Sequence, residues 1–265
     1  MLECVVNVSQ GRDRATIDSL IESCGRSLLD VHTDFDYDRS VFTLAGPRVY
    51  DDVQLLARRV FELVDFRSYG GVHPALGALD VVPFVPLGAT PLEAAVSMRD
   101  RLGSWLAVAF DLPVFVYGGE TTLPQLRNGA FASVSPTYGN PQPNPIFGAV
   151  CVGARGLLVA LNFNLDCSFE RAQVVARALR SAHVRTLAFV AGDRVQVSMN
   201  LIDPLKVTPL MVVQRVLAIE MIRSIELVGL LPEVVVIGHE AEYEALGVNS
   251  EATIEGRLRR QIAHS

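Results

Sequence analysis

The chain has little charge and no long apolar or basic runs. Charged residues make up 20% of its 265 residues, apolar residues make up 50%, and the net charge is −6. No basic run or basic helical stripe occurs, so we expect no binding to nucleic acid. The apolar runs are strand-length or interrupted by charge, so we expect neither a membrane span nor a membrane partner. Such a composition provides for a sizeable core and is not typical of disorder.

The few cysteines form no metal-binding spacing. The chain contains Cys4, Cys24, Cys151 and Cys167, which stand far apart without a Cys-x-x-Cys or His–Cys pattern. The N-terminus has no basic region followed by an apolar stretch, so we expect no secretory signal. A reduced, cytoplasmic protein without a metal is the simplest interpretation.

Signatures of several enzyme classes are also missing. The sequence has no serine-hydrolase elbow, no phosphate loop and no dinucleotide-binding glycine motif. Carboxylates alternate at Asp34, Asp36 and Asp38, as they do in calcium loops. The glycine and the distant glutamate of a calcium loop are absent, so a metal is the weaker alternative there. We expect instead that Asp38 and Arg39 form an ion pair that orients the arginine toward an anion.

Apolar periodicity predicts an α+β fold in two parts. Alternating apolar residues, as in 2–8, predict strands, and spacings of three and four, as in 51–64, predict helices between them. Segment 118–145 is rich in proline and glycine and predicts a long loop. We place the domain change directly after it, with subdomains over 1–147 and 148–265. Each part combines strands with strand–helix–strand units, which indicates two α+β layers.

The segment from Gly70 to Phe84 is the best candidate for chemistry. His73 follows a Gly-Gly-Val stretch and precedes Pro74, which places it on a constrained loop before a buried strand. The ordinary pKa of histidine lies near neutrality, so an imidazole on this loop can accept a proton. The alternative is a turn residue without a chemical role.

Two strands of the second half carry rows of uncharged polar side chains. One strand places Asn162 and Asn164 on the same face, and the other does so for Gln196, Ser198 and Asn200. Amides and hydroxyls in such rows suit a polar ligand with several donors and acceptors. The alternative is a solvent-facing sheet surface, although such surfaces usually carry more lysine, glutamate and threonine.

Taken together, these motifs resemble those of the glutamate formiminotransferase family. The matching segments are 3–12, 28–32, 39–43, 46–47, 73–74, 77–84, 148–150, 153–155, 160–165, 196–201 and 227–232. They occur in the family's order over nearly the whole chain. As a set they are specific.

The resemblance implies a fold, a reaction and a mechanism. The implied fold has two subdomains whose mixed β-sheets face each other across a ligand tunnel, with helices outside, usually in a homodimer. The implied reaction transfers a formimino group from N-formimino-L-glutamate to the co-substrate tetrahydrofolate, in histidine degradation and one-carbon metabolism. His73 matches the family's catalytic histidine. In that role it takes a proton from the attacking folate amine and returns it to the departing glutamate nitrogen.

The resemblance also assigns residues to the two small-molecule sites. The implied substrate- and folate-binding residues are Asn7, Asp38, Arg39, Phe147, Gly148, Asn162, Asn164, Gln196, Ser198 and Asn200.

The chain departs from the family pattern beside His73. The family carries a glutamate before the histidine and an arginine after the following proline, whereas this chain has Val72 and Ala75. The connecting segment before Gly148 is also shortened. Two alternatives to the family reaction therefore stay open. One is a relative that keeps the fold and a polar pocket but has become a folate-like or other ligand-binding or accessory protein. The other is a transferase with a different one-carbon or amidine donor.

Overall fold

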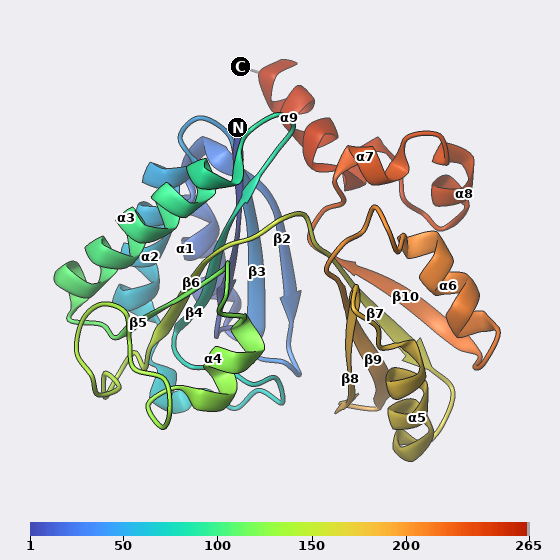
Figure 1. The fold of residues 1–265 in the computed structure, drawn as a ribbon, viewed down its shortest axis with the longest axis horizontal. Coiled ribbons are helices and arrows are strands. Elements are labelled where there is room, and N and C mark those ends of the chain that lie inside the picture. The colour runs from blue at the N-terminus through green and yellow to red at the C-terminus, as the bar shows by residue number, and fades with distance from the viewer. Residues whose placement is uncertain (264–265) are drawn as a thin grey trace. The chain divides into compact units, whose positions relative to one another are not determined.

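A computed structural model describes residues 1–263, and the chain divides into two compact units (Figure 1). The first unit comprises Met1–Arg155 and the second begins at Gly156. Each unit combines one β-sheet with helices, which confirms the predicted α+β class. Among the described residues, no helix combines the length and apolar character that crossing a membrane requires.

The first unit is built around a six-stranded mixed sheet. Its strands are β1 (Leu2–Val8), β2 (Leu28–Asp34), β3 (Arg39–Ala45), β4 (Leu79–Pro86), β5 (Val114–Tyr117) and β6 (Val150–Ala154). Their order across the sheet is β2-β3-β1-β4-β6-β5. Strands β1 to β4 pair antiparallel, whereas β6 lies between β4 and β5 and is parallel to both.

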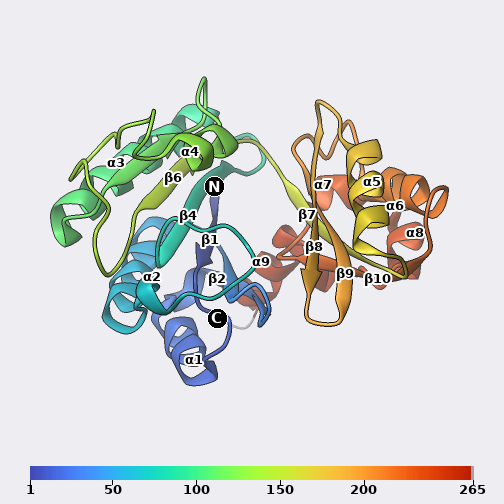
Figure 2. The same ribbon diagram turned by 90° about the horizontal axis from the view of Figure 1, so that it is seen from below.

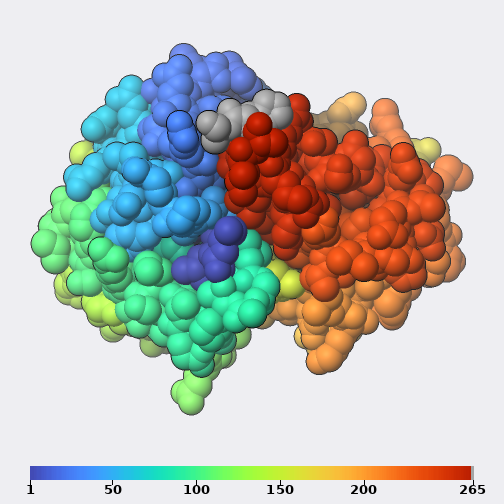
Figure 3. All heavy atoms as spheres, turned by 90° about the horizontal axis from the view of Figure 1, so that it is seen from above, coloured from blue at the N-terminus to red at the C-terminus, as the bar shows by residue number. Residues whose placement is uncertain are grey.

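Three helices cover one face of this sheet (Figures 1 and 2): α1 (Arg14–Ser23), α2 (Val49–Leu63) and α3 (Leu92–Phe110). Alternate strand residues such as Phe42 and Phe84 are fully buried against Leu56 and Leu102 of the helices. Burial of large apolar side chains of this kind, about 1.5–3 kcal/mol each, is the main source of stability for the unit. Figure 3 shows the first residues (dark blue) beside the segment before α3, where the Met1 amino group contacts Thr90 Oγ1.

The opposite face of the sheet carries a smaller apolar cluster. Helix α4 (Leu123–Gly129) packs there, with Leu126 in the same cluster as Phe115 of β5 and Cys151 of β6. Two short 3-10 turns, η1 (Gly25–Ser27) and η2 (Phe66–Ser68), complete the unit. This second face carries the polar residues of the first unit's candidate site.

The second unit contains a four-stranded sheet in the order β10-β7-β9-β8. Its strands are β7 (Val159–Leu165), β8 (Val184–Ala191), β9 (Arg194–Leu201) and β10 (Ile222–Val228). Every pairing is antiparallel, so the mixed sheet that the family resemblance implied is wrong for this unit.

Helices α5 (Phe169–Leu179) and α6 (Pro209–Leu217) cover the apolar face of the second sheet (Figure 1). Phe163 of β7 and Met199 of β9 point into this core. The residues that alternate with them along each strand face the other way. The remaining elements of the unit are α7 (Glu233–Val236), α8 (Glu240–Ala245), η3 (Ser250–Ala252) and α9 (Ile254–Ala263).

Two local features differ from the sequence expectation. The predicted long loop over 118–145 contains α4, because Pro124 stands in the first turn of this helix, where its missing N–H costs no hydrogen bond. The compact units divide after Arg155, whereas the subdomain change after residue 147 stays a prediction. Strand β6 has to belong to the first unit, since it supplies the only ladder that joins β5 to the rest of the described sheet.

Candidate functional site

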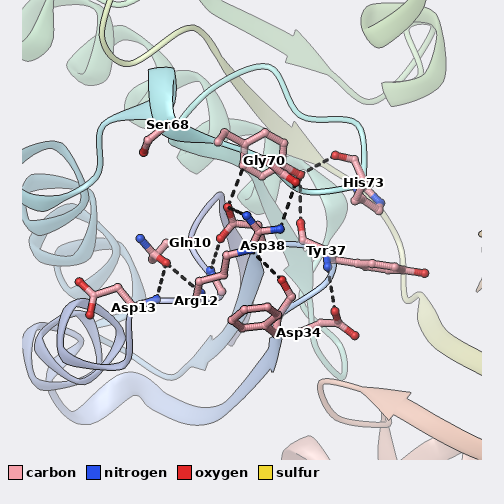
Figure 4. A network of polar contacts seen from close by, with 12 residues as sticks. Gln10, Arg12, Asp13, Asp34, Tyr37, Asp38, Ser68, Gly70 and His73 are labelled. Carbon is pink, nitrogen blue, oxygen red and sulfur yellow. Dashed lines mark hydrogen bonds and ion pairs between the residues drawn. The ribbon is translucent and has the colours of Figure 1, made fainter. Parts of the chain in front are cut away.

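His73 lies on a loop between η2 and β4 that has no helix or strand pairing over residues 69–76. Figure 4 shows how side chains hold this loop against two others. The Asp38 carboxylate accepts the Gly11 amide at 2.9 Å and the Gly70 amide at 3.3 Å, and it lies 3.7 Å from the Arg12 guanidinium. Asp38 therefore joins the loop after β1, the β2–β3 turn and the His73 loop.

The other residues of the acidic segment also build the turn. The Asp34 carboxylate accepts the Tyr37 amide at 2.8 Å, and the backbone of Asp38 adopts a left-handed φ of 49°. Arg12 donates to the carbonyls of Phe35 and Gly70, each at 3.1 Å. Within residues 1–263 no group of three or more metal-binding side chains comes together. The carboxylates of Asp34 and Asp38 thus serve to hold the turn and its neighbouring loops.

The imidazole of His73 is oriented by the backbone of the next residue. Its Nδ1 lies 2.9 Å from the Pro74 carbonyl, and its ring centroid lies 5.6 Å from that of Tyr37. A carbonyl only accepts hydrogen bonds, so Nδ1 carries the hydrogen in the neutral ring and Nε2 carries the lone pair. The contact with the Pro74 carbonyl thereby defines the tautomer of the neutral ring.

A buried ion cluster lies on the face of the first sheet that α1 to α3 leave uncovered. One oxygen of Asp80 on β4 lies 2.7 Å from Arg39 of β3 and 2.6 Å from Arg127 of α4. The other oxygen accepts the Leu76 amide at 2.8 Å. A register shift in β1 between Asn7 and Val8 accompanies this placement of Asp80. Bulges of this kind commonly redirect side chains next to active sites.

Burial and charge set the pKa values in this region. Burial by itself raises the pKa of Asp80, but Arg39, Arg127 and the Leu76 amide lower it below the ordinary carboxyl value overall. Burial and then the positive charges of the same two arginines lower the pKa of His73 to about 3, although Asp80 and the Pro74 carbonyl oppose this. His73 is therefore a neutral imidazole throughout the physiological pH range.

The expected Asp38–Arg39 ion pair is corrected by this geometry. Arg39 pairs with Asp80, and Asp38 is used to hold the three loops together. That Arg39 is directed toward an anion stays a prediction. The guanidinium groups of Arg39 and Arg127 share the single carboxylate of Asp80, so the cluster has an excess positive charge.

Sequence reasoning missed three residues of this region. Asp80 lies within the motif 77–84, where nothing local assigns it a role, and Arg127 lies in the segment 118–145, which the sequence predicts to be a loop. Tyr69 stands four positions before His73 and donates a hydrogen bond to the His73 carbonyl. No local pattern marks Asp80 and Arg127, since these two partners lie 47 positions apart.

The other predicted first-unit residues lie around the same loop. The Asn7 amide oxygen accepts from Arg39 Nε at 3.2 Å. The ring of Phe147 packs against Phe61 with centroids 5.0 Å apart, and Gly148, with φ of 72°, approaches so closely that a Cβ there would lie 2.3 Å from the Leu76 carbonyl. These last two residues support the His73 loop from the core side, and their predicted contact with folate stays a prediction.

The five polar residues of the second unit share one face of its sheet, as predicted. Asn162 and Ser198 are register partners, as are Asn164 and Gln196, and Asn200 lies farther along β9. The Gln196 amide donates to Asn164 at 3.0 Å. Asn162, Asn164 and Gln196 are buried, Ser198 is partly buried and Asn200 is exposed. Only Asn200 matches the alternative of a solvent-facing surface.

Strand β10 extends this polar row. Asn162 donates to Glu226 and Asn164 donates to Ser224, each at 2.9 Å. Both acceptors follow from the pairing of β10 with β7. This face of the second unit therefore carries two hydrogen-bonded groups: Gln196, Asn164 and Ser224 form one, and Asn162 and Glu226 form the other.

Comparisons with known proteins agree with these features. A family model described as "Formiminotransferase domain, N-terminal subdomain" matches residues 1–155. The chain is 30% identical to a glutamate formimidoyltransferase of Thermoplasma acidophilum, with 100% of this chain and 99% of the relative covered. It is also 30% identical to a glutamate formimidoyltransferase of Streptococcus pyogenes serotype M1, with 77% of this chain and 78% of the relative covered.

Longer relatives match over part of their length. A formimidoyltransferase-cyclodeaminase of Sus scrofa is 30% identical over 77% of this chain, but the match covers 44% of that protein.

Proposed function

Because the chain belongs to the formiminotransferase family, we propose that it transfers a formimino group from N-formimino-L-glutamate to tetrahydrofolate. The observation that carries the proposal is the neutral His73, oriented by the Pro74 carbonyl and influenced by the charges of Arg39 and Arg127. A neutral imidazole can accept a proton, and the arginines can attract the carboxylates that both substrates carry.

In the proposed reaction, His73 moves one proton between two nitrogens. Nε2 takes the proton from the folate ring amine as its nitrogen forms a bond to the formimino carbon. The resulting imidazolium then donates this proton to the glutamate nitrogen as the bond between that nitrogen and the carbon breaks. Because Nδ1 stays bonded to the Pro74 carbonyl, the same ring nitrogen can serve both steps.

The arginine pair gives a reason why the low pKa of His73 is compatible with this role. A base works best when its pKa lies near the operating pH. A substrate carboxylate beside Arg39 and Arg127 would offset part of the positive charge that lowers the pKa of His73. Substrate binding would therefore raise the basicity of the imidazole at the moment when it is needed.

We further propose that residues 1–147 and 148–265 correspond to the two formiminotransferase subdomains, apart from β6, which completes the first unit's sheet. In this proposal Asn7, Asp38, Phe147 and Gly148 belong to the binding region of the first subdomain. In the same proposal, the polar face of the second unit's sheet supplies the remaining polar contacts to folate or substrate; its predicted members are Asn162, Asn164, Gln196, Ser198 and Asn200.

The family and the cysteines support a proposal for the setting of the reaction. All four cysteines are present as thiols, which agrees with a reducing, cytoplasmic location. We propose that the protein acts there as a homodimer, in histidine degradation and one-carbon metabolism.

An assay with N-formimino-L-glutamate and tetrahydrofolate tests the proposal. The protein should turn over this pair, and His73→Ala should lower kcat by about 10²-fold or more, since general acid–base catalysis contributes roughly 10²–10⁴-fold. His32→Gln is the matched control, because His32 lies on β2 of the same unit and should leave kcat unchanged. Retained binding of tetrahydrofolate without turnover would contradict the proposal and indicate a ligand-binding protein.

A further inference from the structure

Tyr69 contacts the backbone of the proposed catalytic residue. Its hydroxyl lies 2.5 Å from the His73 carbonyl and 3.1 Å from the Tyr37 carbonyl, so one proton is shared between two acceptors. Its ring stacks on that of Phe66 with centroids 5.4 Å apart. Stacking on Phe66 therefore positions the Tyr69 hydroxyl where the β2–β3 turn meets the His73 loop.

A short chain of contacts leads from this hydroxyl to the imidazole. The hydrogen bond to the His73 carbonyl restrains the peptide plane between His73 and Pro74. The proline ring fixes the next backbone angle, φ, near −65°. The distance of 2.9 Å between the Pro74 carbonyl and Nδ1 then depends on ψ of Pro74 together with ψ and the side-chain torsions of His73.

Tyr37, the second acceptor of the Tyr69 hydroxyl, also contacts the imidazole of His73. Tyr37 has its ring beside that of His73 and its carbonyl on the Tyr69 hydroxyl. A Cβ at Gly71 would lie 2.0 Å from this carbonyl and 2.6 Å from the hydroxyl. Tyr37 and Tyr69 therefore pack directly against Gly71, and a side chain at position 71 would displace one of them.

We propose that Tyr69 is a positioning residue for the transfer reaction: its hydroxyl holds the His73–Pro74 backbone so that Nδ1 bonds to the Pro74 carbonyl and Nε2 faces the reacting groups. This inference rests on the proposed function, in which His73 moves the proton. Tyr69 does not touch the reacting atoms in this role. It acts through the tautomer and the orientation of His73.

The variant Tyr69→Phe removes the hydroxyl and keeps the ring that stacks on Phe66. A catalytic group displaced by about 1 Å can cost about 10²-fold in rate. Since other contacts still hold the loop, we expect kcat to fall about tenfold, with KM for both substrates unchanged within about twofold. Tyr50→Phe is the matched control, because Tyr50 lies on α2 with its ring against Arg101. It should leave kcat unchanged.

Nitrogen-15 NMR of the histidine rings gives a readout that a merely structural role would not move. The chain has five histidines, and the His73 signals are those lost in His73→Gln. We expect a neutral Nδ1–H ring in the unsubstituted protein and a mixture of the two neutral tautomers in Tyr69→Phe. If Tyr69→Phe fails to fold, Gly71→Ala takes its place in this experiment. The added methyl group crowds the same junction, so this variant should shift the tautomer in the same direction.

The possible outcomes separate the two proposals. Tyr69→Phe with an unchanged kcat and an unchanged tautomer would overturn the positioning role. A fall in melting temperature with an unchanged tautomer would also overturn it, because Tyr69 would then only stabilise the fold. If the unsubstituted protein does not turn over the substrate pair, the proposed function fails, whereas the NMR result still decides whether Tyr69 sets the tautomer.

Discussion

At the scale of single residues, the first unit uses buried charge to define the state of one histidine. Asp80 is fully buried between two arginines, and the same arginines lower the pKa of the nearby imidazole. Because each charge has partners from other segments, the state of His73 depends on groups far from it in sequence.

The pH dependence of stability should carry the signature of His73. Its pKa of about 3 in the folded protein lies below the unfolded value of about 6.5. The unfolded chain therefore binds an additional proton between these values, so stability is lost as pH falls through this window. From pH 7 to pH 4.5, urea unfolding should show that the unsubstituted protein loses about 2–3 kcal/mol more than His73→Gln. Equal losses in the two proteins would contradict the lowered pKa.

Removing the buried carboxylate should be strongly destabilising. Asp80→Asn leaves Arg39 and Arg127 without their shared anion, and breaking a buried pair in this way costs about 3–5 kcal/mol. Chemical denaturation measures the loss. Asp100→Asn is the control, because Asp100 lies 2.8 Å from Arg99 with 42% of its side chain exposed and should cost less than about 1 kcal/mol. A similar cost for both variants would mean that burial adds nothing to the interaction.

At the scale of elements, the site depends on how closely three loops approach one another. Gly11 follows β1, and a Cβ there would lie 2.3 Å from the Asp34 carbonyl and 2.4 Å from the Arg39 nitrogen. Its amide also donates to Asp38. A side chain at this position would separate the first loop from the β2–β3 turn.

Gly11→Ala should therefore lower the free energy of unfolding by about 1–3 kcal/mol, the usual cost of overpacking. Gly156→Ala is a suitable control, because a Cβ at Gly156 has no atom within 4 Å, and it should change stability by less than about 0.5 kcal/mol. Thermal unfolding of both variants checks the comparison. Equal stability of the two would show that the loops can move apart without cost.

At the scale of the whole molecule, the two units have separate cores and separate sheets. Strand β6 decides where the first unit ends, since it pairs with β4 on one side and β5 on the other. A fragment that lacks β6 leaves β5 without a sheet neighbour. The structural boundary can therefore be tested directly.

The fragment 1–155 should fold on its own and unfold cooperatively, whereas the fragment 1–147 should not. The expectation rests on the parallel pairing of Val152 in β6 with Val82 and Val116. Circular dichroism during thermal unfolding of both fragments tests it. Cooperative unfolding of the shorter fragment would favour the boundary predicted from sequence.

Sequence patterns were sufficient for much of the fold. Alternation in 2–8 and in 195–201 predicted strands that the structure contains as β1 and β9, with the polar residues of β9 on one face. Short elements were harder to predict. Strand β6 has five residues and α4 has seven, so neither is long enough to show a clear period.

The sequence by itself determined the α+β class, the place of His73 on a loop before a strand, and membership of the family. These follow from local periodicity and from motifs that are contiguous in the chain. The tertiary structure alone decided which charges surround the imidazole. Asp80 lies 41 positions from Arg39 and 47 positions from Arg127. Only strand register, the β1 irregularity and the packing of α4 bring these three residues together. Side-chain pairing at such separations depends on the folded backbone, which no local pattern in the sequence records.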